Sequence, residues 1–377
     1  MALPRDAGGD PTGWAALLNE ARERLLPPLE EALRAVLERR LQPSSGRPPN
    51  RREHLEPADL PPNAPGHYGM MRYHLGWLDE RLEPAAAPTG KRLRPLICLL
   101  AAEACGAPAG RALPAAVALE LLHNFTLIHD DIEDRDEVRH HRPTVWKLWG
   151  EAQAINAGDG MHVLAHLTLL DLEAQGVSPE TIVRLARRFA ETSLIITEGQ
   201  HLDLAFERRD DVTPAEYLDM IARKSAALLG CAAATGAEIA GAAPEYVDAL
   251  AAYGMQLGLA FQIRDDVLGI WGKEETTGKP AADLRKRKKT LPALYALTRA
   301  DDPDREAIRH LFSTPAPGED DVARVLEALD RTSARRHCEH MVAHYSAAAR
   351  ERLALLPDSA ARQVLEALIV QLETREF

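Results

Sequence analysis

From Tyr68 onward, apolar residues recur at helical spacing along almost the whole chain. Runs of period-two alternation rich in β-branched residues, which would predict strands, are absent. Thr213-Pro214-Ala215-Glu216 is a capping box with proline at the first helical position, and Ser178-Pro179-Glu180 and Asp302-Pro303 are similar start signals. The pattern predicts an all-α bundle with helices near residues 68–82, 91–105, 111–134, 151–174, 179–206, 214–236, 244–271, 289–299, 303–313, 331–355 and 358–374.

The first 62 residues have a different pattern. Leu17 to Leu25 have helical spacing, Pro27-Pro28 is expected to interrupt the helix, and the periodicity resumes from Leu29 to Leu41. Residues 43–65 then contain many prolines, a composition typical of a linker. We therefore expect an N-terminal extension over residues 1–62 and one helical domain over residues 63–377.

Composition limits the classes of partner and compartment. The formal net charge of −12 argues against a nucleic-acid partner, which needs a basic surface. The cysteines show no C-x-x-C spacing and the N-terminus shows no signal-peptide pattern, so a cytoplasmic location is expected. The most apolar stretch, residues 226–243, is broken by Glu238, which favours a packed helix over a membrane span.

Two acidic clusters stand at the ends of helical stretches, Asp130-Asp131-Ile132-Glu133-Asp134 and Asp265-Asp266. Residues i and i+4 share a helix face, so each cluster can direct carboxylates into one space. Close like charges repel one another unless a cation lies between them. Mg²⁺ is usually held by one or two carboxylates together with substrate phosphates, so two facing clusters would hold a diphosphate.

Basic residues are placed where a diphosphate site would need them. Lys91 lies in the segment Gly90 to Pro95, Lys279 lies between Gly278 and Pro280, and Lys286, Lys288 and Lys289 form a short basic run. Such cations could neutralise phosphate oxygens and the charge on a departing diphosphate. A solvated basic face is the alternative interpretation of Lys286–Lys289, and also of Lys224.

Five ordered motifs resemble those of the all-trans isoprenyl diphosphate synthases, also called polyprenyl synthetases. The resemblance covers roughly residues 66–350, and it implies an all-α isoprenoid synthase fold with a central cavity, usually as a homodimer. The motifs are Gly90-Lys91-Arg92-Leu93-Arg94-Pro95, His123 to Asp134, Pro143-Thr144, Glu198-Gly199-Gln200 and Phe261-Gln262-Ile263-Arg264-Asp265-Asp266.

This resemblance also implies roles for individual residues. Asp130, Asp131 and Asp134 would bind Mg²⁺ and the allylic diphosphate, and Asp265 and Asp266 would hold a further Mg²⁺ on the same diphosphate. The remaining roles are isopentenyl diphosphate binding by Lys91, Arg94 and His123, allylic diphosphate binding by Arg139, and neutralisation of the leaving group by Lys224, Gln262, Lys279 and Lys288.

The chain departs from the family pattern before Pro143-Thr144. Two arginines and a glycine are common there, whereas this chain has Arg139-His140-His141-Arg142. His140 therefore takes the place of an arginine that helps to hold isopentenyl diphosphate. Histidine lacks the permanent charge and the bidentate geometry of arginine, so phosphate binding is expected to weaken unless Arg142 compensates.

Product length depends on the residues that precede the first cluster. Phe125 lies five positions before Asp130, and an aromatic residue there, followed by the small Thr126, resembles the archaeal-type geranylgeranyl diphosphate synthases. The expected product is therefore geranylgeranyl diphosphate, with 20 carbons. An ordinary core position is the alternative interpretation of Phe125.

Three functions are compatible with these residues. The first is an Mg²⁺-dependent all-trans prenyltransferase that condenses isopentenyl diphosphate with an allylic diphosphate. The second is a class I terpene cyclase or irregular coupling enzyme, although the Asn, Ser and Glu motif of cyclases is missing. The third is a non-catalytic subunit of a heteromeric synthase, although both aspartate pairs are intact.

Overall fold

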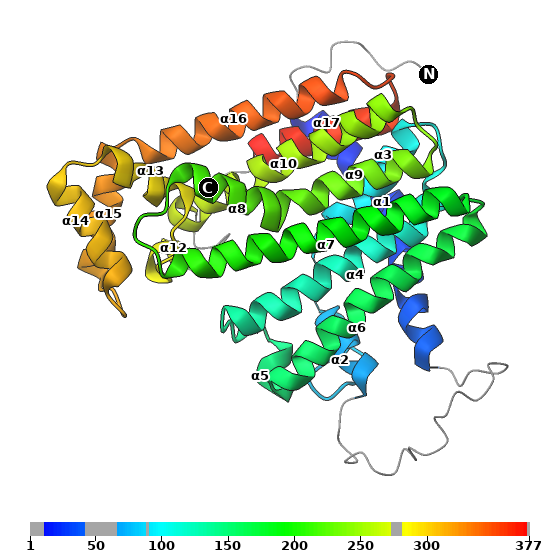
Figure 1. The fold of residues 1–377 in the computed structure, drawn as a ribbon, viewed down its shortest axis with the longest axis horizontal. Coiled ribbons are helices and arrows are strands. Elements are labelled where there is room, and N and C mark those ends of the chain that lie inside the picture. The colour runs from blue at the N-terminus through cyan, green and yellow to red at the C-terminus, as the bar shows by residue number, and fades with distance from the viewer. Residues whose placement is uncertain (1–10, 42–65, 88–89, 273–280, 375–377) are drawn as a thin grey trace. The chain divides into compact units, whose positions relative to one another are not determined.

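The computed structural model describes residues 11–41, 66–87, 90–272 and 281–374 (Figure 1). The all-α prediction is confirmed, because helices dominate these residues. The helices are α1 Pro11–Leu41, α2 His67–His74, α3 Leu93–Ala104, α4 Ala109–Glu133, α5 Val145–Trp149, α6 Glu151–Leu170, η2 Asp171–Gln175, α7 Pro179–Glu207, α8 Pro214–Ile221, η3 Ala222–Ala226, α9 Ala227–Ile239, α10 Pro244–Trp271, α12 Ala282–Arg285, α13 Leu291–Arg299, α14 Asp302–Ser313, α15 Glu319–Arg331, α16 Ala334–Leu353 and α17 Ala360–Glu373.

Several predicted helix boundaries were wrong. The helix expected over 68–82 ends at His74, and the helix expected over 214–236 contains a π-helical segment at residues 222–226. Helix α15 was missed, although the Asp321 carboxylate accepts a hydrogen bond from the Gly318 N–H at its start. The prolines and glycine at residues 315–318 obscured this start, since such residues usually mark loops.

Helix α1 runs without interruption through Pro27 and Pro28, which contradicts the predicted break. Both prolines are exposed, whereas one face of the helix is buried at Leu29, Leu33 and Leu37, each fully inaccessible to solvent. Burial of several leucines on one face contributes more than the hydrogen bonds that proline removes. The boundary predicted at residue 62 lies outside the described residues and stays a prediction.

The described chain forms two compact units, and each is described by itself. The first contains Met1–Arg22, Leu100–Ala109 and Arg187–Phe377. In this unit α10 packs along α9 and α16 (Figure 1). A Cβ atom on Gly254 of α10 would lie 2.3 Å from the carbonyl oxygen of Leu229, so glycine permits this close approach of α9 and α10.

An apolar cluster in the first unit supports the end of α10. It joins Ile270 to α12 and to helices α13–α16 through the buried residues Leu284, Ala296, Ile308, Leu311, Val322, Val325, Ala328, Leu329 and Ala334. Because α12 and the end of α10 share this core, the residues that follow the second acidic cluster have a fixed support.

The second unit contains Glu23–Leu99 and Gly110–Ala186. In it, α6 packs against α2 and α5. Two-residue strands, β1 Val138–Arg139 and β2 Arg142–Pro143, pair antiparallel in a hairpin. The sequence pattern did not predict this hairpin, because two residues are too few to show a period.

Helix α4 is the one described helix that is long and apolar enough, by length and composition, to cross a membrane. In its most apolar window 67% of the residues are buried inside the structure, as in the core helix of a water-soluble protein. One such helix is weak evidence of a membrane span, and the burial accounts for its apolar composition.

Candidate active site

The first acidic cluster lies at the C-terminal end of α4. Asp130 and Asp131 belong to its last turn, and Asp134 follows directly after the helix, with its backbone N–H donating to the Asp130 carbonyl at 2.8 Å. The C-terminal end of a helix carries partial negative charge, which disfavours carboxylates. Three acids at this end therefore favour a cation nearby.

Asp131 is the buried member of the cluster. Its Oδ1 atom accepts a hydrogen bond from Arg139 Nε at 2.7 Å, whereas its Oδ2 atom is buried without a hydrogen-bond partner among the described residues. Burial raises the pKa of Asp131 to about 6, although Arg139 lowers it. A buried carboxylate oxygen without a partner is unfavourable unless a cation lies beside it.

A small cavity, about 20 Å³ in volume, has Asp131, Arg139, His140 and His74 in its lining. This is about the volume that one water molecule needs. Among the described residues, no group of three or more His, Cys, Asp or Glu side chains could enclose a metal ion by itself. The unsatisfied Asp131 oxygen fits a hard divalent cation that takes few protein ligands and completes its shell with water and phosphate.

The β1–β2 hairpin places Arg139 on Asp131. Its turn consists of His140 and His141, with φ angles of 51° and 63°. Two positive φ values are typical of a type I′ turn, in which asparagine and glycine are favoured. His140 at the tip is exposed, and partial burial, Arg139 and His141 lower its pKa, so the imidazole is mostly neutral near pH 7.

Arg142 is engaged elsewhere and does not take the place of the missing arginine. Its guanidinium donates to the backbone carbonyls of Tyr73 at 3.0 Å and Leu78 at 2.6 Å. It also stacks over the Tyr73 ring, 4.0 Å from the ring centroid. These contacts fix the hairpin to the segment after α2, so the compensating role considered for Arg142 has no support.

The structure brings Arg94 of α3 and His123 of α4 together. Arg94 Nη1 lies 3.1 Å from His123 Nε2, and because a guanidinium can only donate, His123 accepts with Nε2. Burial lowers the pKa of His123 well below its usual value, and Arg94, Arg139 and His74 lower it further. A neutral His123 thus orients Arg94, while Lys91 is exposed two residues before α3.

Phe125 and Thr126 lie on α4 within the two turns before Asp130. The Phe125 ring packs against His162 of α6, with the ring centroids 4.7 Å apart, and meets His129 edge-on at 4.9 Å. Thr126 Oγ1 donates to the His123 carbonyl at 2.7 Å. The ring of Phe125 is therefore held between two histidines and is only half-buried.

The second acidic cluster lies near the end of α10 in the first unit. Asp266 is buried, and its Oδ2 atom accepts from Tyr217 Oη at 2.7 Å and from the Leu291 N–H at 3.4 Å. Its Oδ1 atom accepts from Gln262 Nε2 at 3.3 Å. Burial raises the pKa of Asp266 to about 7, although the Tyr217 hydrogen bond lowers it. Asp265, the neighbouring acid, is half-buried.

Gln262 links this carboxylate to the π-helical segment. Its Oε1 atom accepts from Ser225 Oγ at 2.9 Å, so both ends of the amide have partners within the protein. Lys224, which directly precedes Ser225, places its Nζ atom 2.6 Å from Asp203 Oδ2 on α7. Lys224 thus lies in a π-helical turn, a feature found frequently at functional sites.

Gly199 of the Glu198-Gly199-Gln200 motif allows Lys224 to approach α7. A Cβ atom at Gly199 would lie 2.3 Å from the Lys224 backbone nitrogen, which is closer than real Cβ contacts. The motif glycine therefore has a packing role, because only a residue without a side chain fits there.

Asp283 of α12 fills the space beside Gly269. A Cβ atom at Gly269 would lie 2.0 Å from Asp283 Oδ2, so a third acid in the motif would require the Asp283 side chain to move. Burial raises the pKa of Asp283, while Lys288 and Lys286 lower it. Lys288 is exposed, and its backbone N–H donates to the Asp283 carbonyl at 2.8 Å. Lys279 lies outside the described residues.

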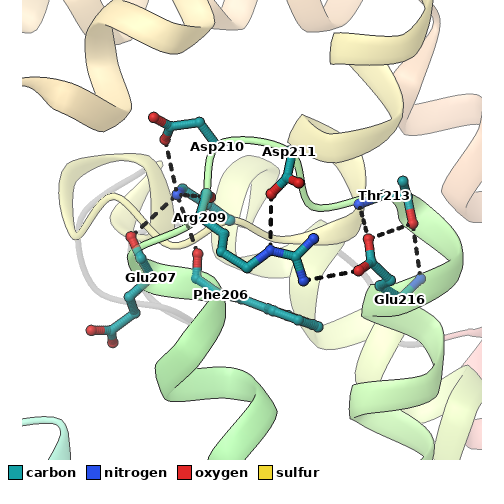
Figure 2. Close-up of polar contacts among 8 residues, drawn as sticks. Phe206, Glu207, Arg209, Asp210, Asp211, Thr213 and Glu216 are labelled. Atoms are coloured by element: carbon teal, nitrogen blue, oxygen red, sulfur yellow. Dashed lines mark hydrogen bonds and ion pairs between the residues drawn. The ribbon is translucent and has the colours of Figure 1, made fainter.

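Lys289 anchors the connection between α7 and α8, where Figure 2 shows Phe206, Glu207 and Arg209. Its Nζ atom contacts the backbone carbonyls of Phe206 and Glu207, each at 3.2 Å, and that of Arg209. Helix C-terminal carbonyls lack partners within the helix, so the ammonium supplies hydrogen bonds at the end of α7, where the Phe206 carbonyl also accepts from the Arg209 N–H. Beside this anchor, Arg209 pairs with Asp211 and Glu216, and the Thr213 capping box is confirmed.

The sequence analysis missed several residues that shape these sites. Tyr217, Asp203 and Asp283 contact predicted residues, but each comes from a different helix and carries no motif of its own. Tyr217 gave a weak signal, since it lies one position after the capping box. The two acidic clusters belong to different units, and the prediction that they face one another stays a prediction.

Comparison with known proteins identifies the chain's relatives. The polyprenyl synthetase family model matches residues 76–329. Over 271 residues the chain is 46% identical to (2E,6E)-farnesyl diphosphate synthase of Mycobacterium tuberculosis, covering 71% of this chain and 74% of that one. Over 248 residues it is 43% identical to geranylgeranyl diphosphate synthase of the same organism, covering 66% and 69%.

A solved structure agrees with these relatives. The polyprenyl synthetase of Streptomyces coelicolor A3(2) superposes with a TM-score of 0.80 at 35% identity, over 95% of this chain and 99% of that one. The chain therefore belongs to the polyprenyl synthetase family, and it is an all-trans prenyltransferase.

Proposed function

We propose that this prenyltransferase condenses isopentenyl diphosphate with an allylic diphosphate and stops at geranylgeranyl diphosphate, with Mg²⁺ as its metal. The family implies the two substrate classes. Its relatives include both farnesyl and geranylgeranyl synthases, so the relatives alone favour a short chain without choosing between 15 and 20 carbons.

The observation that carries the choice of product is the packing of Phe125. Its ring lies on α4 within two turns of the first acidic cluster, held against His162 and His129. A half-buried aromatic ring fixed on both sides can block a growing apolar chain, because moving it would disturb two ring contacts. We take Phe125 as the floor of the site, with the small Thr126 beside it.

Magnesium would be held by Asp130, Asp131 and Asp134 from one cluster and by Asp265 and Asp266 from the other. When bound, it would supply the positive charge that makes diphosphate a good leaving group. The buried Asp131 oxygen without a hydrogen-bond partner supports this assignment. The hydrogen bonds from Arg139 and Tyr217 would keep the carboxylates of Asp131 and Asp266 in fixed orientations.

The remaining residues would bind and orient the two substrates. Lys91 and Arg94 would hold isopentenyl diphosphate, with neutral His123 orienting Arg94. Arg139 would contact the allylic diphosphate, and Lys224, Lys279 and Lys288 would neutralise the departing diphosphate.

The reaction needs no nucleophile from the protein. The allylic C–O bond breaks, and its electron pair leaves with the diphosphate. The double bond of isopentenyl diphosphate forms the new C–C bond, and one proton is lost. The products are thus an elongated diphosphate, inorganic diphosphate and a proton, and water must be excluded because it would trap the cation.

We also propose a homodimer. Helix α6 exposes Ile155, Val163, Leu167 and Leu170, which are 40–56% exposed and lie within about one third of the helix circumference. Contiguous exposed apolar residues favour an interaction surface. Light scattering on the purified protein should give twice the chain mass, and Val163→Glu with Leu167→Glu should give the monomer mass; a wild-type monomer would overturn this proposal.

The test of the reaction is product analysis. The purified protein with Mg²⁺ and isopentenyl diphosphate is incubated separately with dimethylallyl, geranyl and farnesyl diphosphate, and the products are identified by mass spectrometry. Accumulation of the 20-carbon diphosphate from all three supports the proposal. A product that stops at 15 carbons, or one that continues beyond 20, overturns the assigned length. Alcohol or hydrocarbon made from the allylic substrate alone would instead indicate a cyclase.

A further inference from the structure

A buried arginine joins the N-terminal helix to the basic segment before α3. Arg92 lies between Lys91 and Arg94, and its Nε atom is 2.6 Å from Glu30 Oε1 on α1. Its Nη1 atom is 2.5 Å from Glu120 Oε1 on α4. All of these residues belong to the second unit, so one guanidinium connects α1, α4 and the basic segment within it.

Arg92, Glu30 and Glu120 form a group of ion pairs that is largely shielded from solvent. The side chains of Arg92 and Glu120 are 4% and 3% exposed, and that of Glu30 is 29% exposed. Asn124 Nδ2 donates to Glu120 Oε1 at 2.9 Å, which fixes that carboxylate further. Burial alone lowers the pKa of Arg92, but the two carboxylates outweigh it and the pKa is raised. A buried charge of this kind is tolerated because it is paired.

Arg92 also has an unusual backbone conformation. Its φ angle is 51°, in the left-handed region that non-glycine residues seldom adopt, so the surrounding contacts must hold it there. Its carbonyl accepts from the Leu96 N–H at 3.1 Å, in the first turn of α3. The ion pairs of Arg92 therefore set the direction in which the chain passes from Lys91 into α3.

Arg92 itself is not placed to bind a phosphate. Its Nε and Nη1 atoms are engaged by carboxylates, and its Nη2 atom is buried, with no hydrogen-bond partner among the described residues. A diphosphate arriving from solvent would meet Lys91, which is exposed, and Arg94, which is half-buried.

We infer that α1 positions the diphosphate-binding segment for the reaction, through the contact of Glu30 with Arg92. Glu30 and Arg92 are positioning residues, and Lys91 and Arg94 are the groups they position. This inference rests on the proposed role of Lys91 and Arg94 in binding isopentenyl diphosphate. It assigns a function to a helix that precedes the residues matched by the family model, which begin at residue 76.

The test is steady-state kinetics of Glu30 variants, with the adjacent Glu31 as the matched control. Glu31 is on the same helix and is exposed. Glu30→Ala and Glu30→Gln should raise the KM for isopentenyl diphosphate by about tenfold, because small displacements of binding groups weaken the bound geometry. The KM for the allylic diphosphate should change less than twofold, and Glu31→Ala and Glu31→Gln should match the wild type.

Lys91→Ala is a reference variant that tests the binding role of Lys91 separately from the positioning role of Glu30. Lys91→Ala should raise the KM for isopentenyl diphosphate if the proposed binding role holds. If Lys91→Ala raises it and Glu30→Ala does not, the positioning inference is overturned while the binding role stands. If Lys91→Ala has no effect, the binding role itself fails.

Thermal unfolding distinguishes positioning from simple support of the fold. Glu30→Asp, which keeps the charge, should recover part of the affinity for isopentenyl diphosphate lost in Glu30→Ala. If Glu30→Ala instead lowers kcat and raises both KM values together, in step with a lower Tm, the contact only stabilises the fold and the inference is overturned.

Discussion

Asp131 and Asp266 share one arrangement, a buried carboxylate that accepts a short hydrogen bond from another side chain. Arg139 orients the first at 2.7 Å and Tyr217 orients the second at 2.7 Å. Burial raises both pKa values, to about 6 and about 7. A cation beside either carboxylate would lower its pKa and displace the proton, because the cation removes the unfavourable cost of a buried charge.

Replacement of Asp131 by alanine should remove most of the turnover. We expect kcat to fall by at least about a hundredfold, because the buried oxygen is the part of the cluster best suited to a cation. Helical content measured by circular dichroism should not change. Glu133→Ala, an exposed neighbour on the same turn, should keep nearly full activity. Full activity in Asp131→Ala would exclude the proposed metal role.

Replacement of Phe125 by alanine should lengthen the product. Removing the ring leaves space beside His162 and His129, so chain growth should continue past 20 carbons. Mass spectrometry of the dephosphorylated products measures the change. Phe125→Leu keeps part of the volume and should give a mixture of lengths, whereas an unchanged product in Phe125→Ala would place the floor elsewhere.

Two short connections each depend on a particular residue, and the first of them carries Arg139, which is predicted to bind substrate. The hairpin β1–β2 turns through His141, which has a φ angle of 63°, and the α7–α8 connection is held by Lys289. Neither connection has hydrophobic periodicity, so their stability comes from turn geometry and hydrogen bonds.

Replacement of His141 by glycine should stabilise the protein. Glycine adopts positive φ without the steric cost of a side chain, so the free energy of unfolding should rise by about 0.5–1 kcal/mol. For a chain of this size the expected increase in Tm is about 1–2 °C. His141→Ala retains the strain and should give no increase, and a glycine variant no more stable than the alanine variant would contradict the argument.

Replacement of Lys289 by methionine should destabilise the first unit. The side chain is 11% exposed, and methionine would remove the ammonium that donates to the Phe206, Glu207 and Arg209 carbonyls. We expect the free energy of unfolding to fall by about 1–3 kcal/mol in urea titrations. Lys286→Met, at an exposed position in the same basic run, is the control and should lie close to the wild type.

Half-buried His74 gives the protein a stability that depends on pH. Burial lowers the pKa of His74 to about 3, and Arg139, His140 and Arg92 contribute. In the unfolded chain a histidine titrates near ~6.5. Below that pH the unfolded state binds a proton that the folded state does not, so stability is lost as pH falls from ~6.5 toward ~3.

Removal of this histidine should reduce the pH dependence. His74→Gln should show a smaller fall in unfolding free energy between pH 7.5 and pH 5 than the wild type, by at most about 1.4 kcal/mol per pH unit. Chemical denaturation at several pH values measures this slope. His340→Gln, at an exposed site, should leave the slope unchanged, and equal slopes for His74→Gln and the wild type would rule out this contribution.

Much of the fold could be predicted from the sequence, because helices depend on local sequence patterns. Helical periodicity and start signals such as Thr213 to Glu216 arise from neighbours in sequence, and they predicted most of the long helices. The errors had a common cause. Local signals at Pro27-Pro28 and at residues 315–318 indicated breaks. At Pro27-Pro28 the burial of an apolar helix face outweighed the signal, so the helix continues. At residues 315–318 the signal obscured the start of α15, which follows directly.

The all-α class, the family and the position of the acidic clusters could be predicted from the sequence, since motif spacing and periodicity run along the chain. The distant residues that contact these motifs became known from the packing of the helices. Tyr217 donates to Asp266, Asp283 fills the space at Gly269, and Glu30 pairs with Arg92. These contacts join residues far apart in sequence, and their formation depends on how complete helices pack, which no local pattern records.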